Sequence, residues 1–337
     1  MIRRRTFLGI AAAGALAPTL ARAQSGGQAK PFRIYRITYR GRTEVEDGFD
    51  DYLASNGVAV EFIERDAERD VARLPGFVEE IRSVKPDLVY TWGTPVTLGI
   101  AGRYDAPDKA KFITDIPIVF ALVASPVAAG LVADRATPNR NLTGAVHVVP
   151  TETQLRAMHS YRPITKLGVL YSASEQNSVS IVQEARDLQQ PMNFTLVERQ
   201  FRTGGDGRPV PDGIEELIAE IRNEGANWLY LLPDTFLGTQ YDRVAPAAMA
   251  QNLPTFGAAE LAIRQGGALV ALISRYYSVG QLAASKAVKI LRKETPVAEI
   301  PIETLKRFSL IINMPVAKKL DLYPPIDMLN YAEVLTG

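Results

Sequence analysis

Two short segments of the chain combine a hydroxyl side chain with a proline directly after an apolar run. They are Trp92-Gly93-Thr94-Pro95 and Ala124-Ser125-Pro126. A hydroxyl residue at the N-cap and a proline at the first helical position are typical of a helix start, where unpaired backbone N–H groups favour a carboxylate. For either Thr94 or Ser125 taken alone, capping of its own helix is as good an explanation as ligand binding. Two such starts on neighbouring strands favour a site for an acidic ligand.

Further candidates lie where we expect other strands to end. Aromatic rings there can stack on a ligand or pack against the protein, and charged groups can bind a ligand or stay solvated. We expect Trp92 and Tyr276 to sandwich an apolar group, and Asp234 or Glu44 to take an ammonium group if the ligand has one. Arg40 and Arg275 are further charges near these rims. The expected ligand-binding set is Tyr39, Arg42, Glu44, Trp92, Gly93, Thr94, Ser125, Pro126, His147, Ser172, Ser174, Asn177, Asp234, Glu260 and Tyr276.

The sequence lacks the motifs of most enzymes. It contains no G-x-S-x-G, Walker A or H-E-x-x-H pattern. With no Cys and only two His, thiolate chemistry is excluded and little remains for a metal site, so we expect no metal and no cofactor. A hydrolase that uses Ser125 with His147 is a minor alternative. We expect a binding protein rather than an enzyme.

The first residues have the pattern of an export signal. Arg4-Arg5-Thr6-Phe7-Leu8 leads into an apolar run that ends at Ala21-Arg22-Ala23, which predicts a signal at residues 1–23 cleaved near Ala23. The paired arginines resemble a twin-arginine signal, although an Arg-rich Sec signal or an uncleaved anchor is an alternative. No Cys follows the run, so we expect no lipid anchor. The expected location is the periplasm.

Removal of that segment deletes four arginines and no acid, which takes the formal charge from +1 to −3. No dense run of Lys or Arg remains in the rest of the chain, and we therefore expect no nucleic-acid partner. The roughly 310 remaining residues, in a chain that is 47% apolar, are enough for two domains. We expect a monomer.

Short apolar runs alternate with segments of helical period, which predicts an α/β protein built from βαβ units. In the first half we expect strands at 32–38, 58–64, 88–91 and 116–122, with helices at 44–55 and 74–84 and others that begin at 95 and 126. A similar series follows: helices at 151–161, 176–189, 214–223 and 241–251, and strands at 166–171, 193–201, 228–232, 255–257 and 268–273.

A long helix at 279–292 and an extended stretch at 308–313 come after the second series is complete, and we expect them to cross between the two halves. The predicted fold is two doubly wound lobes joined by three crossing segments. The N-terminal lobe would contain residues 32–145 and 275–306, and the C-terminal lobe 146–274 and 307–337. A ligand would lie in the cleft between the carboxyl ends of the two sheets.

These segments resemble a known family, the periplasmic solute-binding proteins of ABC transporters with the type I bilobal fold, and within it the tryptophan and tyrosine uptake branch. The likeness extends over nearly all of the chain after the export signal. The residues that carry it are Gly48-Phe49, Tyr52-Leu53, Pro86-Asp87-Leu88-Val89, Gly93-Thr94, Ile116-Pro117-Ile118-Val119-Phe120, Ser125-Pro126, Gly130-Leu131, Asn141-Leu142-Thr143-Gly144, Lys166-Leu167-Gly168-Val169-Leu170-Tyr171, Gly266-Gly267-Ala268-Leu269, Tyr276-Tyr277 and Ile312-Asn313.

The resemblance implies that hinge closure of the lobes captures a small molecule, which passes to an inner-membrane permease driven by a separate ATPase. We expect the ligand to be an aromatic or amino-acid-like carboxylate held by Thr94, Ser125 and nearby backbone N–H groups. The alternative from another class is a periplasmic sensor module that signals to a membrane receptor kinase.

Overall fold

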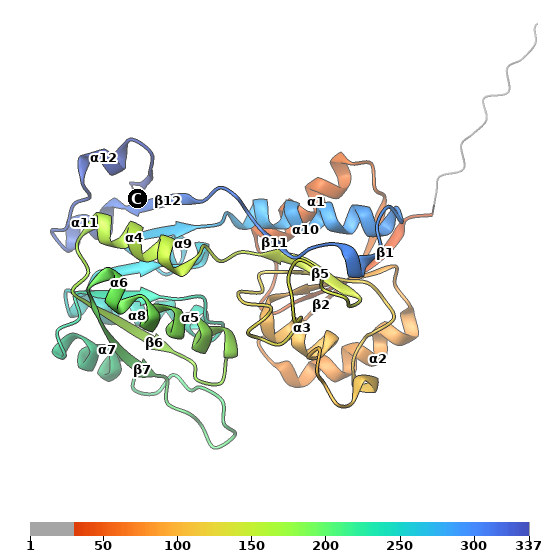
Figure 1. Cartoon of the computed structure of the whole chain (residues 1–337), viewed down its shortest axis with the longest axis horizontal. Coiled ribbons are helices and arrows are strands. Elements are labelled where there is room, and N and C mark those ends of the chain that lie inside the picture. Colours follow the sequence, from red (N-terminus) through yellow and green to blue (C-terminus); the bar gives the residue numbers. More distant parts are fainter. Residues whose placement is uncertain (1–29, 337) are drawn as a thin grey trace, which may run out of the picture. The chain divides into compact units, whose positions relative to one another are not determined.

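The computed structural model describes residues 30–336, and the predicted export signal lies outside them. Two sheets organise this part of the chain (Figure 1). The first is entirely parallel, in the order β11-β5-β4-β3-β1-β2. Its strands are β1 (Phe32–Thr38), β2 (Val60–Asp66), β3 (Leu88–Trp92), β4 (Ile118–Ala121), β5 (Leu142–Val146) and β11 (Glu303–Thr304).

The second sheet has the order β13-β12-β10-β9-β8-β6-β7. Its pairs are parallel apart from β10 with β12, which is antiparallel. The strands are β6 (Lys166–Tyr171), β7 (Thr195–Gln200), β8 (Trp228–Leu231), β9 (Thr255–Gly257), β10 (Val270–Ile273), β12 (Ser309–Asn313) and β13 (Glu333–Leu335). Most of these strands are buried and rich in Val, Ile, Leu and aromatic residues, as expected for a sheet covered on both faces.

Helices accompany both sheets, and we call each sheet with its helices a lobe. The first lobe has α1 (Glu44–Ser55), α2 (Leu74–Val84), α3 (Gly93–Ala101) and α10 (Tyr276–Leu291). The second lobe has α4 (Thr151–Tyr161), α5 (Gln176–Asp187), α6 (Gln189–Met192), α7 (Ile214–Asn223), α8 (Tyr241–Ala250), α9 (Glu260–Arg264), α11 (Met314–Lys319) and α12 (Ile326–Leu329). No helix within residues 30–336 combines the length and apolar character needed to cross a membrane.

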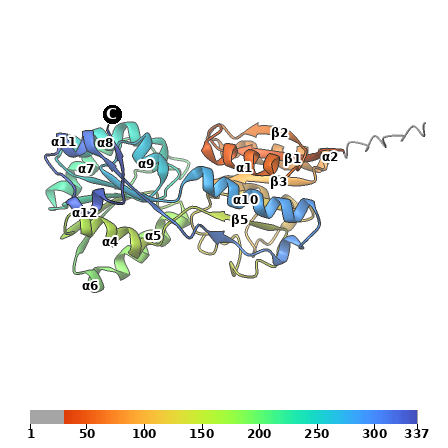
Figure 2. The ribbon, with the colours of Figure 1, turned by 90° about the horizontal axis from the view of Figure 1, so that it is seen from above.

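The chain passes between the sheets three times: from β5 to α4, from β10 to α10, and from β11 to β12 (Figures 1 and 2). The two sheets belong to one compact unit. The predicted fold of two α/β lobes joined by three crossings is confirmed. We keep 32–145 with 275–306, and 146–274 with 307–337, as the proposed bounds of the lobes.

Helices α1 and α10 pack closely although more than two hundred residues separate them, and glycines make this possible. A Cβ at Gly48 would lie 2.0 Å from the Tyr277 carbonyl oxygen, and one at Gly280 would lie 1.9 Å from the Val45 carbonyl oxygen. Helix α1 begins with a capping box, because Thr43 accepts from Val45 N and its own N–H donates to the Glu46 carboxylate. The packing of α1 against α10 attaches the returning helix α10 to the first lobe.

Two predicted helix starts are wrong. Helix α3 begins at Gly93 and has Trp92 as its N-cap, so Thr94 does not cap it. Gly93 has φ +78°, which turns the chain from β3 directly into the helix and moves its start ahead of Pro95. After Pro126 there is a single hydrogen-bonded turn, in which Leu131 N donates to the Pro126 carbonyl, and Gly130 at φ +70° ends it. Ser125-Pro126 therefore does not begin a long helix.

Candidate functional site

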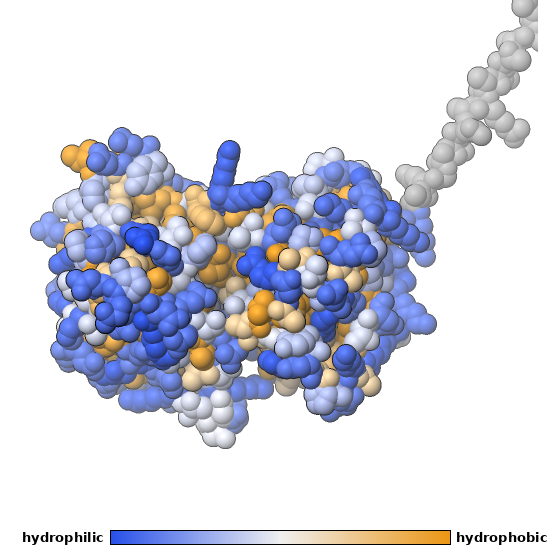
Figure 3. Space-filling view, viewed as in Figure 1, coloured by the Kyte–Doolittle hydropathy of each residue, from blue (hydrophilic) through white to orange (hydrophobic). Residues whose placement is uncertain are grey.

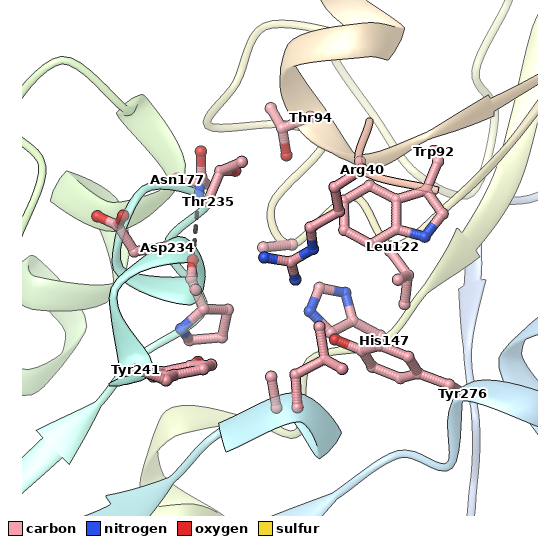
Figure 4. Close-up of a pocket in the computed structure, with 16 residues that line it drawn as sticks. Arg40, Trp92, Thr94, Leu122, His147, Asn177, Asp234, Thr235, Tyr241 and Tyr276 are labelled. Carbon is pink, nitrogen blue, oxygen red and sulfur yellow. Dashed lines mark hydrogen bonds between the residues drawn. The ribbon is translucent and has the colours of Figure 1, made fainter. Parts of the chain in front are cut away.

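A small cavity of about 40 Å³ lies between the lobes, at the carboxyl ends of both sheets (Figure 4). This is where parallel α/β sheets place ligands, because the loops that follow neighbouring strands meet there. We call it the inner cavity. Its lining is Arg40, Trp92, Gly93, Thr94, Leu122, Ala124, His147, Asn177, Pro233, Asp234, Thr235, Gly238, Tyr241, Ala259, Leu261 and Tyr276.

A larger cavity of about 680 Å³ adjoins it, and we call this the outer cavity. Thr94, Asn177 and Thr235 line both cavities, so the two are continuous parts of one interlobe cleft. Apolar side chains of Leu98 and Phe236 contribute to the outer cavity from opposite lobes. Figure 3 shows a mostly hydrophilic face with apolar residues gathered near its middle. The outer cavity has the size typical of small-molecule sites.

The structure brings about half of the predicted set together in the inner cavity, and two more in the outer one. Trp92, Gly93, Thr94, His147, Asn177, Asp234 and Tyr276 line the inner cavity, and Tyr39 and Ser174 line the outer cavity. Ser172 is buried and binds Asp234. The others lie elsewhere: Arg42, Glu44 and Glu260 border a cavity of about 310 Å³, and Ser125 and Pro126 border one of about 470 Å³.

Ser125 was expected to hold a ligand carboxylate, with Pro126 also in the binding set; neither residue lines the inner or the outer cavity, and their binding role stays a prediction. Both residues line the cavity of about 470 Å³ beside α4 and α5, which shares only Ala124 with the inner cavity, and the turn after them does not begin a long helix. Local partners also occupy Arg42 and Glu260. Arg42 donates to Asp47 at 2.9 Å and Asp50 at 3.0 Å, while Glu260 accepts from Tyr276 N at 2.5 Å and from Arg264 at 2.9 Å. Their side chains stabilise the ends of α1 and α10.

The aromatic residues of the cleft already have aromatic or cationic neighbours. Trp92 stacks on Tyr39 with ring centroids 6.3 Å apart and planes at 10°. The Arg40 guanidinium lies 5.2 Å from the Trp92 ring centroid, within cation–π range. Tyr276 meets His147 edge to face, with centroids 6.1 Å apart. Trp92 and Tyr276 are both walls of the inner cavity, and the sandwich of a ligand between them stays a prediction.

Two carboxyl groups of the second lobe lie beside the cleft, and both accept backbone hydrogen bonds. Asp234 accepts from Ser172 N at 2.7 Å, from Ser172 Oγ at 3.0 Å and from Leu237 N at 2.8 Å. Glu175 accepts from Thr235 N at 2.9 Å and Phe236 N at 3.0 Å. Burial raises the pKa of Asp234. Burial, followed by the nearby charge of Asp234, raises the pKa of Glu175 to about 8. These acids hold the loops that follow β6 and β8.

Facing Asp234, the inner cavity carries Arg40 of the first lobe and His147 of the segment that crosses from β5 to α4, whose side chains approach each other in Figure 4. Burial and the positive charge of Arg40 lower the pKa of His147 to about 4, so its imidazole is neutral at neutral pH. Its Nδ1 is buried and has no hydrogen-bond partner within residues 30–336. We find no hydrogen bond or ion pair of the Arg40 side chain in the same part of the chain.

The predicted set missed several lining residues, among them Arg40, Leu122, Thr235 and Tyr241. The first three had a signal in the sequence, because each follows closely after the end of a strand. Arg40 comes two residues after β1, and Leu122 directly follows β4. Tyr241 begins α8 and had no such signal. Within residues 30–336, no three His, Asp or Glu side chains come together as metal ligands.

Residues 35–335 match a family model described as "ABC transporter substrate binding protein". The chain belongs to this family. The resemblance seen in the sequence is thus confirmed, and with it the prediction of a binding protein rather than an enzyme. Members of the family bind a small molecule and work with an ABC transporter, so this substrate-binding protein has both as partners.

Individual proteins are also similar to this substrate-binding protein. A tyrosine-binding protein of Clostridioides difficile (strain R20291) is 27% identical over 272 residues, which cover 80% of this chain and 73% of that protein. The crystal structure of an ABC domain from Streptococcus pneumonia in complex with L-Trp has a TM-score of 0.76 and 20% identity, and the match covers 90% of this chain and 100% of that one. A conserved domain protein from Vibrio cholerae has a TM-score of 0.79 at 22% identity, with 91% and 100% covered. These two structures share the fold.

Proposed function

We propose that this substrate-binding protein captures a small aromatic or amino-acid-like carboxylate in the interlobe cleft and delivers it to an inner-membrane ABC permease. The observation that carries the proposal is the position of Arg40 over Trp92 in a cavity lined by both lobes. A guanidinium recognises a carboxylate, and aromatic walls accept an apolar body. A ligand that touches both lobes favours their closed arrangement.

The aromatic walls extend through both cavities. Trp92 and Tyr276 line the inner cavity, and Tyr39 and Phe236 line the outer one. The relative named a tyrosine-binding protein and the similar fold titled as an L-Trp complex support a ligand of this size and kind. We further propose that the protein acts as a monomer in the periplasm after loss of residues 1–23, without a lipid anchor and without a nucleic-acid partner.

A ligand screen by thermal unfolding tests this proposal. A ligand present at 100 times its dissociation constant stabilises the folded state by about 2.7 kcal/mol, which shifts the unfolding temperature by several degrees. We expect shifts with members of a panel of aromatic acids and amino acids, and none with sugars or metal ions. A clear shift with a sugar and none with any carboxylate would refute the proposed ligand class.

A further inference from the structure

The charges that line the cleft are unequal. Four arginines, Arg40, Arg69, Arg103 and Arg208, line the inner and outer cavities, against two carboxyl groups, Asp234 and Glu175. Arg103 binds Asp105 at 2.9 Å, and Arg208 lies 3.8 Å from Asp70 across the lobes. Arg40 and Arg69 form no such ion pair within residues 30–336, and their positive charge favours an anionic ligand, because a partly enclosed cleft strengthens its field.

Neither carboxyl group is well placed to receive a ligand ammonium. The three donors of Asp234 come from its own lobe, and Figure 4 shows its carboxylate turned away from the Arg40 guanidinium. Both oxygens of Glu175 accept backbone N–H groups. The pKa of Glu175, raised to about 8 by burial and the nearby charge of Asp234, also weakens Glu175 as a negative counter-charge at neutral pH. A buried ammonium without such a counter-charge would cost considerable free energy.

Two donors on the other wall are not used by the protein. The Arg40 side chain has no hydrogen-bond or ion-pair partner among residues 30–336, and His147 is only 7% exposed while its Nδ1 lacks any partner there. Both side chains reach the inner cavity (Figure 4). Buried polar groups are nearly always paired, so a histidine that lines the cavity and has an unpaired Nδ1 is a candidate contact for a ligand. A neutral imidazole can donate one hydrogen bond to an acid oxygen.

We propose that the ligand is an organic acid without an ammonium group, an arylalkanoate rather than an aromatic amino acid, and that Arg40 and His147 bind its carboxylate. This inference rests on the proposed function and narrows its ligand class. The inner cavity of about 40 Å³ has room for little more than a carboxylate beside Arg40. The rest of the ligand extends past Thr94, Asn177 and Thr235 into the outer cavity of about 680 Å³.

Matched ligands that differ only at the ammonium group test this inference directly. The pairs are 3-phenylpropionate with L-phenylalanine, 3-(4-hydroxyphenyl)propionate with L-tyrosine, and 3-(indol-3-yl)propionate with L-tryptophan. Calorimetric titration of the full chain is expected to show at least one acid binding about tenfold or more tightly than its amino acid, because the ammonium would lose its hydration without gaining a counter-charge. The amines phenethylamine, tyramine and tryptamine should not bind.

The outcomes separate this inference from the proposed function. Equal or tighter binding of the amino acid in every pair that binds overturns the inference and leaves the proposed function intact. A chain that binds a sugar but none of these compounds overturns both. A chain that binds none of the compounds and no sugar also contradicts both, since each names a class that the panel contains.

Variants then test the two residues. Arg40→Gln should raise the dissociation constant of the acid about 10- to 100-fold, the usual effect of losing a charge-assisted hydrogen bond. Arg40→Lys keeps the charge but not the two-pronged geometry, so it should restore only part of the affinity. His147→Gln should weaken binding less than Arg40→Gln. The control is Arg307→Gln, an exposed arginine that lines neither cavity. Unchanged affinity in Arg40→Gln with unchanged unfolding temperature would refute the assigned contact.

Discussion

The two walls of the interlobe cleft differ in what their polar groups bind. On the second-lobe wall, Asp234, Glu175 and Asn177 make hydrogen bonds within their own lobe. On the facing wall lie Arg40 of the first lobe and His147 of the segment that crosses from β5 to α4; we call it the first-lobe wall, and there neither the Arg40 side chain nor the His147 Nδ1 has a hydrogen-bond partner among residues 30–336. A polar group that is already paired stabilises the fold, whereas an unpaired one is available to a ligand. Substitutions on the second-lobe wall should therefore mainly change the stability of the fold. Substitutions on the first-lobe wall should mainly change the affinity for the ligand.

The largest effect is expected on the second-lobe wall. Asp234→Ala removes the acceptor of two backbone N–H groups, those of Ser172 and Leu237, inside a buried loop. The free energy of unfolding should fall by about 3 kcal/mol, because each buried donor left unpaired costs about 1–3 kcal/mol. Urea unfolding measures the loss. Asp234→Asn keeps one oxygen acceptor and should lose less.

Two other variants complete that comparison. Asp242→Ala changes an exposed aspartate at the start of α8 and should stay within about 0.5 kcal/mol of the parent protein. Arg40→Gln on the opposite wall should also change stability by less than about 0.5 kcal/mol while it weakens ligand binding. If Asp234→Ala has the same free energy of unfolding as the parent protein, the hydrogen bonds of Asp234 to Ser172 and Leu237 do not stabilise the second-lobe wall.

The second prediction concerns acid pH and the first-lobe wall. Burial and the charge of Arg40 lower the pKa of His147 from its ordinary 6.5 to about 4. Between these pH values the unfolded chain binds a proton that the folded chain does not, so stability falls as the pH is lowered from about 6.5 to about 4. At about 1.36 kcal/mol per pKa unit, the loss reaches at most about 3 kcal/mol.

His147→Gln should remove this part of the pH dependence, measured as the difference in unfolding free energy between the variant and the parent protein at several pH values. The matched control is His159→Gln, because His159 is the other histidine of the chain and is exposed. Carboxyl groups contribute equally to acid unfolding in all three proteins, so their contribution cancels when the unfolding free energy of the parent protein is subtracted from that of a variant. Parallel pH curves for His147→Gln and the parent protein would contradict the low pKa of the buried imidazole.

The third prediction concerns Glu175 on the second-lobe wall, where stability should change with pH in the opposite direction. Burial and the charge of Asp234 raise the pKa of Glu175 from its ordinary 4.5 to about 8. The folded chain then keeps a proton that the unfolded chain has lost, so this residue makes stability fall as the pH rises from about 4.5 to about 8. Glu175 is partly exposed, and solvent screening should make the effect smaller than that of His147.

Glu175→Gln cannot ionise and should remove that loss, although its amide replaces one of the two backbone acceptors and lowers stability at every pH. The slope is therefore the measurement, not the absolute stability. The control is Glu216→Gln, a change at an exposed position in the first turn of α7. Equal slopes for Glu175→Gln and the parent protein would show that Glu175 is ionised in the fold at neutral pH.

The sequence predicted the lobes and the position of the cleft because both depend on local signals that are repeated. Alternation of strands and helices defines parallel sheets, and the carboxyl ends of those strands point to the ligand site. Trp92, Thr94, Asn177 and Asp234 were found in this way. The α1–α10 contact depends on Gly48 and Gly280, which are far apart in the chain, and no local pattern reveals such a pair.

The differences between the predicted and the observed local structure have another cause. Residue type alone does not determine which neighbour a side chain contacts. Ser125-Pro126 has the residues of a helix start, yet the helical conformation ends at Gly130 after a single turn. Asp234 was expected to take an ammonium group if the ligand has one, and this stays a prediction; its carboxylate accepts from the Ser172 and Leu237 N–H groups, which no local pattern reveals. Arg40 was named among the charges near the rims but not in the predicted set, because residue type does not separate a bound rim charge from a solvated one. Only the three-dimensional structure shows that its guanidinium lies over Trp92.

The smallest expected effect tests how closely the two walls approach each other at Arg40. A Cβ at Gly238 of the second lobe would lie 3.0 Å from Arg40 Nη1, closer than an ordinary van der Waals contact. Gly238→Ala should displace the guanidinium from its rotamer, at a cost of about 0.5–1.5 kcal/mol, and raise the dissociation constant of the acid ligand about 3- to 10-fold. Gly205→Ala is the matched control, since nothing lies within 4 Å of its Cβ. If the affinity of Gly238→Ala equals that of Gly205→Ala, Arg40 does not bind the ligand in the position next to Gly238, and the first-lobe wall must present it from another rotamer.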